Sequence, residues 1–228
     1  MERNAFLNKI SAKIGKALLP DAEVTHPGAF TDYSWNPQTP QDELVAQFKH
    51  ELEALTGHVY LLDDVEDSAE TILQILAKHN TKHIIAWGND DLGLPNLREI
   101  LGESGVTIDD NHLPTDEAGR KAQLAKSDEV YIGLTGANGG LADNGAIGIV
   151  SGKGRGRLAS LSPPVHIALL RRDQIYPSIP AFLADHDGVT ADASNLVFIA
   201  GPSRTGDIEM TLSIGVHGPG ETHVIVLP

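Results

Sequence analysis

Short apolar runs alternate with segments of helical periodicity along most of this chain. The apolar runs predict strands at 58–62, 83–87, 106–108, 129–134, 146–150, 165–170, 196–200 and 223–227. Hydrophobic residues spaced three or four apart predict helices at 42–55, 68–79, 96–101, 116–127 and 180–184. Because continuous apolar strands separated by helices are typical of sheets covered on both faces, we predict an α/β fold with a mostly parallel sheet and helices on both faces.

The first 40 residues follow a different pattern. Helical spacing predicts an amphipathic helix over 4–19, and residues 20–40 hold four prolines and several aromatic side chains without a period. We interpret 20–40 as an extended arm that packs either on its own domain or on a second subunit. The chain therefore divides into an N-terminal helix and arm, 1–40, and an α/β domain, 41–228.

Charge and cysteine content exclude several classes of function. A formal net charge of -14 at pH 7 would repel a nucleic-acid backbone, so we expect no nucleic-acid partner. The sequence has no cysteine, which excludes a cysteine nucleophile and cysteine-ligated clusters in this chain. No apolar run reaches the roughly 20 residues of a membrane span, and the N-terminus lacks the features of a signal peptide. These features predict a soluble, cytoplasmic protein.

Two glycine-rich segments with basic and hydroxyl side chains are the best candidates for a binding site. Glycine lets backbone N–H groups approach an anion, and the arginine fork matches a carboxylate or a phosphate. Both segments follow predicted strands, where parallel sheets bind their ligands. We therefore predict a site for a small anionic ligand at these residues: Gly154, Arg155, Gly156, Arg157, Gly201, Ser203, Arg204 and Thr205.

Each segment has a structural alternative. Residues 208–212 have a helical pattern, so Ser203 or Thr205 could cap a helix whose free N–H groups face the anion beside Arg204. The segment is equally compatible with a strand–turn–helix corner in which Arg204 pairs with a nearby carboxylate. The basic segment 152–157 is compatible with either a ligand loop or a solvated hairpin tip.

Asp143 and His217 are the candidate catalytic residues. Asp143 precedes an apolar strand, where a carboxylate can act as nucleophile or general base, but Asp-Asn-Gly is also favoured turn chemistry. His217 stands next to Gly218 in the last glycine-rich stretch, a suitable place for proton transfer. His166 lies within an apolar strand and fits a hydrogen-bonded core residue.

No metal site is predicted. His50, His58, His79 and His83 show no metal-like spacing with a third ligand.

An ordered series of blocks resembles the LUD family, of the lactate-utilisation protein C type. The blocks are Gly-Arg-Gly-Arg-Leu-Ala-Ser-Leu from 154, Pro-Pro-Val-His-Ile from 163, Gly-Pro-Ser-Arg-Thr from 201, Asp-Ile-Glu from 207 and Gly-Val-His-Gly-Pro from 215. The resemblance implies a fold related to sugar-phosphate isomerases and CoA transferases. In the related CoA transferases a Glu-Asn-Gly segment supplies the catalytic glutamate, and the similar position here is Asp143.

The resemblance also implies a role in the oxidation of L-lactate to pyruvate, together with iron–sulfur partner proteins. Because this chain has no cysteine, it matches the accessory member that carries no cluster and no cofactor of its own. Its ligand would be a small carboxylate or a phosphate-bearing molecule. Two other interpretations stay open: a stand-alone enzyme on a phosphorylated sugar or acyl-CoA, and a scaffold subunit without ligand chemistry.

Overall fold

A computed structural model of the chain describes residues 8–9, 38–111, 114–127, 129–186, 188–189, 193–206 and 212–228. The internal contacts divide the chain into two units, Met1–Pro37 and Gln38–Pro228, and nearly all described residues belong to the second. The predicted N-terminal helix and arm lie almost entirely outside the described residues and stay predictions.

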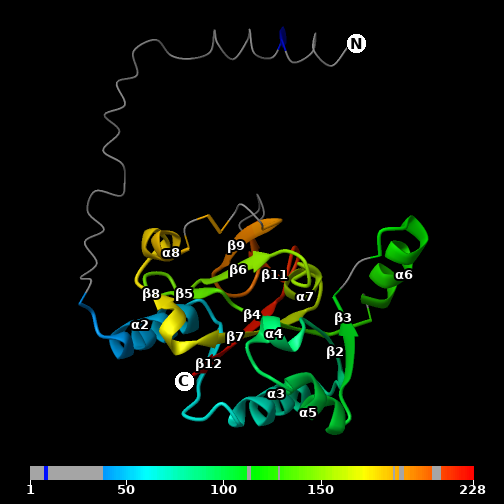
Figure 1. Cartoon of the computed structure of the whole chain (residues 1–228), viewed down its shortest axis with the longest axis horizontal. Helices are drawn as coiled ribbons and strands as arrows, with labels where there is room; N and C mark the ends of the chain where they lie inside the picture. The colour runs from blue at the N-terminus through cyan, green and yellow to red at the C-terminus, as the bar shows by residue number, and fades with distance from the viewer. Residues whose placement is uncertain are drawn as a thin grey trace. The chain divides into compact units, whose positions relative to one another are not determined.

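A six-stranded parallel sheet forms the centre of the described part of the second unit (Figure 1). Its strand order is β1-β12-β7-β4-β2-β3, and every neighbouring pair is parallel. The strands are β1 (His58–Leu61), β2 (His83–Ala86), β3 (Thr107–Asp110), β4 (Ile132–Gly136), β7 (Val165–Arg171) and β12 (Glu221–Leu227). The strands β2, β4, β7 and β12 are buried along most of their length, which explains their continuous apolar runs. The predicted α/β class is confirmed.

Helices cover both faces of this sheet. The helices of the second unit are α2 (Gln41–Ala54), α3 (Asp67–Lys78), α4 (Asn89–Leu92), α5 (Leu97–Glu103), α6 (Glu117–Ser127), α7 (Leu158–Leu161) and α8 (Ile179–Asp185). Of these, α8 packs on a second, smaller sheet, and α6 stands out at the β3 edge (Figure 1). Two glycines of β4 show how close the helices come: a side chain at Gly133 would collide with the Ala159 carbonyl of α7, and one at Gly136 with the Asp91 carbonyl of α4. Positions 133 and 136 face opposite sides of the strand, so α7 and α4 lie on opposite faces.

A second, four-stranded sheet lies beside the first (Figure 1). Its order is β8-β5-β6-β9, with β5 (Gly139–Leu141), β6 (Ile147–Ser151), β8 (Ile175–Tyr176) and β9 (Asn195–Ile199). The strand β6 is antiparallel to both β5 and β9. Gly152 follows β6 and Gly201 follows β9, and both strands belong to this second sheet. The expectation that the two glycine-rich segments follow strands of the parallel sheet is therefore wrong. An apolar run predicts a strand but does not tell which sheet it joins.

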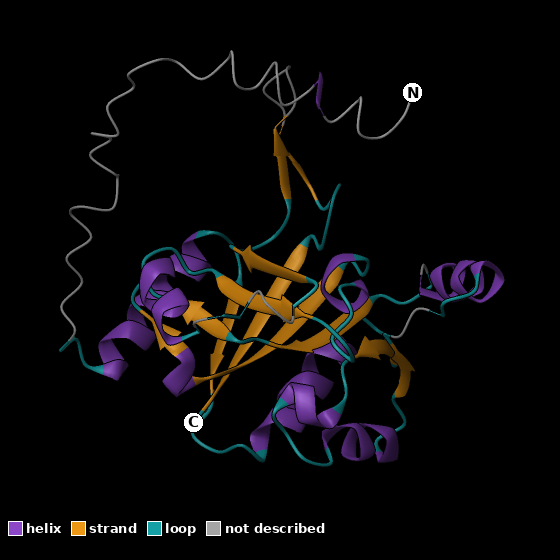
Figure 2. Cartoon of the chain, turned by 45° about the horizontal axis from the view of Figure 1, so that its top comes forward, coloured by secondary structure: helices purple, strands orange, loops and turns teal. Residues whose placement is uncertain are grey.

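The second glycine-rich segment leads into a two-stranded antiparallel ribbon of β10 (Arg204–Gly206) and β11 (Leu212–Ile214). Figure 2 shows this ribbon standing away from the two sheets. Ser203 and Thr205 therefore do not begin a helix at 204–206, and the helical pattern at 208–211 lies outside the described residues. The backbone of Ser203 is instead committed to distant partners: its N–H donates to the Pro219 carbonyl and its carbonyl accepts from the Gly215 N–H.

Within the described part of the chain, no helix is both long and apolar enough to cross a lipid bilayer.

Candidate anion-binding site

The first glycine-rich segment forms a tight turn fixed to the central sheet. Gly152 and Arg155 exchange two backbone hydrogen bonds of 3.1 Å, and Gly154 adopts a φ of +80° that favours glycine. The indole Nε1 of Trp87, just after β2, donates a hydrogen bond of 3.0 Å to the Gly156 carbonyl. The segment is therefore held over the carboxyl end of β2, and its two arginines leave it in different directions.

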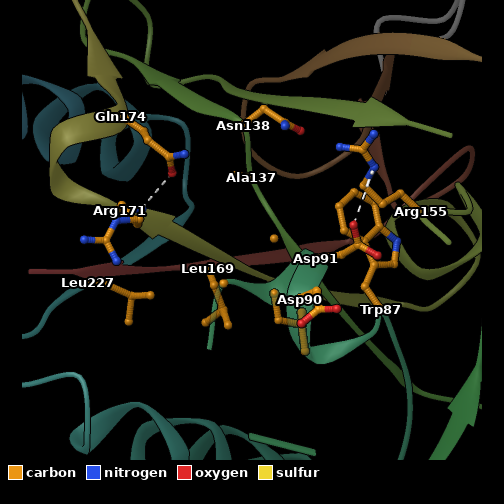
Figure 3. A pocket seen from close by; sticks show the side chains of 13 residues that line it. Trp87, Asp90, Asp91, Ala137, Asn138, Arg155, Leu169, Arg171, Gln174 and Leu227 are labelled. Carbon is orange, nitrogen blue, oxygen red and sulfur yellow. Dashed lines mark hydrogen bonds and ion pairs between the residues drawn. The ribbon is translucent and has the colours of Figure 1, made fainter. Parts of the chain in front are cut away.

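Arg155 points into a cavity of about 200 Å³ beyond the carboxyl ends of β2, β4, β7 and β12 (Figure 3). Its guanidinium Nε lies 3.7 Å from the Asp91 carboxylate. Asp90 and Arg171 also line the cavity, and Arg171 lies 3.5 Å from the Asp173 carboxylate. Because the positive charges here face carboxylates, this cavity offers an anion little net attraction.

Four of the predicted ligand and catalytic residues line a second cavity of about 190 Å³, which we call the Arg157 cavity. They are Arg157, Gly201, Ser203 and His217, and they come from three segments far apart in the sequence. Arg157 and His217 are exposed side chains and stand at its mouth, whereas Gly201 is buried. The structure thus brings together residues of the two glycine-rich segments and of the last glycine-rich stretch, which holds His217.

The Arg157 cavity carries positive charge without a compensating carboxylate. No aspartate or glutamate is among its lining residues in the described part of the chain. Among the described residues, the arginines that form ion pairs are Arg98, Arg155, Arg171 and Arg172. Arg157 is not one of them. Its guanidinium is free to pair with an anion, beside a wall formed by Val197, Phe198 and Ile199.

Thr222 on β12 adds a buried hydroxyl that the sequence did not suggest. Its side chain is 1% exposed, it lines the Arg157 cavity, and its Oγ1 has no hydrogen-bond partner within the described residues. Buried polar atoms nearly always have a partner, so an unpartnered hydroxyl at a cavity wall is suited to a ligand oxygen. A lone threonine in an apolar run carries no sequence signal of such a role.

His166 lies beside Thr222 in the register of β7 and β12. Its Nε2 is 2.8 Å from the Thr135 hydroxyl, which confirms the expected hydrogen-bonded core histidine. Complete burial, with a smaller contribution from His223, lowers the pKa of His166 to about 4. The imidazole is therefore neutral at pH 7.

Arg204 and Thr205 do not line the Arg157 cavity. The Arg204 guanidinium donates hydrogen bonds to the Leu55 carbonyl and the Thr56 hydroxyl, at the C-terminal end of α2. Asp207, one of its possible carboxylate partners, lies outside the described residues. The ligand roles of Arg204 and Thr205 stay predictions.

Asp143 lies in the turn between β5 and β6, and the expected turn chemistry is confirmed. The Asn144 side-chain oxygen accepts a hydrogen bond of 2.9 Å from the Ala146 N–H, and the Asp143 N–H donates to the Pro177 carbonyl. Burial raises the pKa of the Asp143 carboxyl group. Its catalytic role stays a prediction, and it lines neither the Arg155 cavity nor the Arg157 cavity.

The chain belongs to the LUD domain family, whose model matches residues 45–227. A protein named "Lactate utilization protein C" from Geobacillus sp. (strain WCH70) is 31% identical over 195 residues, which cover 82% of this chain and 79% of the relative. A second protein of the same name, from Halalkalibacterium halodurans, is 28% identical over 237 residues. This match covers 99% of this chain and 97% of the relative.

The crystal structure of a DUF162 family protein from Deinococcus radiodurans has the same fold. It aligns with a TM-score of 0.62 and 20% identity, over 83% of this chain and 99% of that one. The resemblance to the LUD family and the α/β fold are both confirmed.

Proposed function

We propose that this chain is an accessory component of an L-lactate oxidation system and binds a small anionic ligand in the Arg157 cavity. The relatives named lactate utilization protein C support the cellular role. Cysteine-ligated iron–sulfur clusters need thiolates that this sequence does not contain, so the clusters belong to partner proteins. We place the assembly in the cytoplasm.

The observation that carries the ligand proposal is the meeting of Arg157, Ser203 and His217 in one cavity, which no carboxylate of the described residues lines. The guanidinium fork of Arg157 suits a carboxylate or phosphate group, because it donates two parallel hydrogen bonds to two oxygens. The hydroxyl groups of Ser203 and Thr222 would donate to further oxygens. His217, at the mouth, would hold or release a proton beside the bound group.

Calorimetric titration of the purified chain with L-lactate, pyruvate and inorganic phosphate tests the ligand proposal. We expect saturable binding of at least one of them, weakened about tenfold or more in Arg157→Gln, which removes a charge-assisted hydrogen bond. Arg155→Gln is the matched control, because it changes the same tight turn but faces the other cavity. Flat titrations of the unaltered chain, or equal losses in the two variants, would overturn the ligand proposal.

Growth tests the cellular role separately. A strain that lacks this chain and any redundant lactate-oxidation system should not grow on L-lactate, and the unaltered chain should restore growth. Normal growth of the deletion strain would disprove the role in lactate oxidation, whatever the titrations show.

A further inference from the structure

The amino-terminal edge of the central sheet, opposite the carboxyl ends, carries a cluster of imidazoles around one carboxylate. The strands β1 and β12 are parallel, with His58 in register with His223, and Glu221 lies two residues before His223 on the same face. The imidazole rings of His58 and His223 stack with centroids 4.7 Å apart. Glu221 Oε1 lies 2.9 Å from His223 Nε2 and 3.5 Å from His58 Nε2.

These three side chains form a ligand set for a metal ion. One donor atom from each of His58, Glu221 and His223 lies within 4.8 Å of the other two. In a tetrahedral zinc site, bonds of about 2.0–2.2 Å place neighbouring donors about 3–3.5 Å apart, close to the two separations between Glu221 and the histidines. We propose that His58, Glu221 and His223 bind a divalent transition-metal cation of the zinc class, leaving a fourth coordination position open.

Tyr60 supports this assignment by fixing the orientation of His223. The side chain of His223 is fully buried, and its Nδ1 lies 3.1 Å from the Tyr60 hydroxyl. A metal-bound histidine usually donates its second ring N–H to a neighbouring acceptor, which orients the ring. Without a metal, Nε2 donates its proton to the Glu221 carboxylate and Nδ1 accepts from the Tyr60 hydroxyl. Metal binding would place the ring proton on Nδ1, which then donates to the Tyr60 oxygen and leaves the Nε2 lone pair for the metal.

His79 adds a second independent observation. Its Nε2 is buried, has no hydrogen-bond partner within the described residues, and lies 3.5 Å from Glu221 Oε1. At 3.5 Å the two atoms are too close for a water molecule between them, so a hydrogen-bond partner for this nitrogen must stand beside the carboxylate. A metal-bound water beside Glu221 would give this nitrogen a partner.

Lys78 is the natural competitor of the metal. Its ammonium lies 2.7 Å from Glu221 Oε1 and supplies the positive charge that the cation would bring. The Lys78 side chain is 55% exposed, so it can move into water when a cation binds. Glu221 also lines a cavity of about 510 Å³, which gives a cation a route from solvent.

Zinc titration of the full chain, purified in chelator and then freed of it, tests the proposal. We expect one Zn²⁺ per chain, with affinity reduced about tenfold or more in His58→Ala and in Glu221→Gln. Neither substitution removes a buried apolar group, since the His58 side chain is 45% exposed and glutamine keeps the shape of Glu221. His50→Ala, at an exposed position of α2, should leave the affinity unchanged.

Two further variants separate a built site from incidental binding. Lys78→Met removes the competing ammonium and should increase the affinity for Zn²⁺, whereas loss of an ordinary surface ion pair would not. Arg157→Gln should leave zinc binding intact, so failure of the anion proposal and failure of this one are distinguishable. Replacing Zn²⁺ with Co²⁺ should give the strong visible absorption of a four-coordinate ion, lost in His58→Ala.

Three outcomes would overturn the proposal: no saturable zinc binding, equal affinity in His58→Ala, Glu221→Gln and the unaltered chain, or no gain in affinity with Lys78→Met. The second would identify an adventitious ion only.

Discussion

The guanidinium of Arg204 donates a hydrogen bond of 2.6 Å to the backbone carbonyl of Leu55. Leu55 follows the last residue of α2, where carbonyl groups have no partner within the helix. Arg204 therefore caps the negative end of α2 and ties the β10–β11 ribbon to this helix. Although Arg204 stands in a glycine-rich segment, its guanidinium binds the protein's own backbone.

We expect Arg204→Ala to lower the free energy of unfolding by about 1 kcal/mol, because an exposed charge-assisted hydrogen bond at a helix end is lost. Anion affinity should stay within about twofold of the unaltered chain, since Arg204 does not line the Arg157 cavity. Urea denaturation and calorimetric titration measure the two quantities. Lost anion binding with unchanged stability would instead make Arg204 a ligand residue.

The close approach of α7 to β4 gives a second prediction. A methyl group at Gly133 would collide with the Ala159 carbonyl, and backbone cannot move aside as a flexible side chain can. Gly133→Ala should therefore lower the free energy of unfolding by about 3 kcal/mol or more. Gly102→Ala is the matched control, because Gly102 lies in α5 and the added carbon would meet no atom within 4 Å beyond its chain neighbours and its own helix backbone.

The control should stabilise the chain by about 0.5–1 kcal/mol, as expected for glycine to alanine in an exposed helix. Thermal or urea unfolding of both variants provides the comparison. Equal stability of Gly133→Ala and the unaltered chain would mean that α7 does not approach β4 this closely.

The central sheet was predictable because its strands are buried on both faces. The run predicted at 83–87, for example, corresponds to β2 at His83–Ala86. The strand β5 was missed because two of its three residues are Gly139 and Gly140, which have no apolar side chain. Their bare backbone is required by packing, since an added carbon would meet Phe182 at Gly139 and Leu170 at Gly140.

The candidate site was predictable by residue type but not by arrangement. Arginine, serine and histidine near glycines indicated an anion site, and Arg157, Ser203 and His217 do share one cavity. The tight turn directs Arg155 into a different cavity. Sequence spacing cannot reveal this turn. His58 and His223 were not expected to meet, because strand order and register alone bring them together.

The pKa of His166 gives a pH dependence of stability. Its folded pKa, about 4, lies below the ordinary value of 6.5, so the unfolded chain binds the proton first as pH falls. The stabilisation is therefore complete above pH 6.5 and is lost progressively as pH falls towards 4. Between pH 8 and pH 5 this residue should account for a loss of about 2 kcal/mol.

Urea denaturation at these two pH values measures the loss in the unaltered chain and in His166→Gln. Glutamine can keep a hydrogen bond to the Thr135 hydroxyl but does not titrate, so the loss on acidification should be smaller in this variant. An identical pH dependence in both proteins would show that His166 is not the group responsible.

The hydrogen bond from Trp87 to the Gly156 carbonyl positions Arg157, the next residue in the turn. Trp87 is 1% exposed, so Trp87→Phe keeps an aromatic ring in the core but leaves that carbonyl without its donor. The turn should then sample other conformations, and the guanidinium of Arg157 would have to be ordered again on binding. We expect anion affinity to fall by roughly three- to tenfold, with a loss of about 1 kcal/mol in stability.

A merely destabilising substitution would not lower the affinity of the folded protein, which separates a positioning role from a structural one. Calorimetric titration well below the unfolding temperature makes that distinction, with Phe48→Leu as the control because Phe48 is an equally buried aromatic residue that lines neither cavity. Equal affinities in Trp87→Phe and the unaltered chain would show that the turn holds Arg157 in place without the indole. A loss confined to Trp87→Phe would link the carboxyl end of β2 to the Arg157 cavity through a single hydrogen bond.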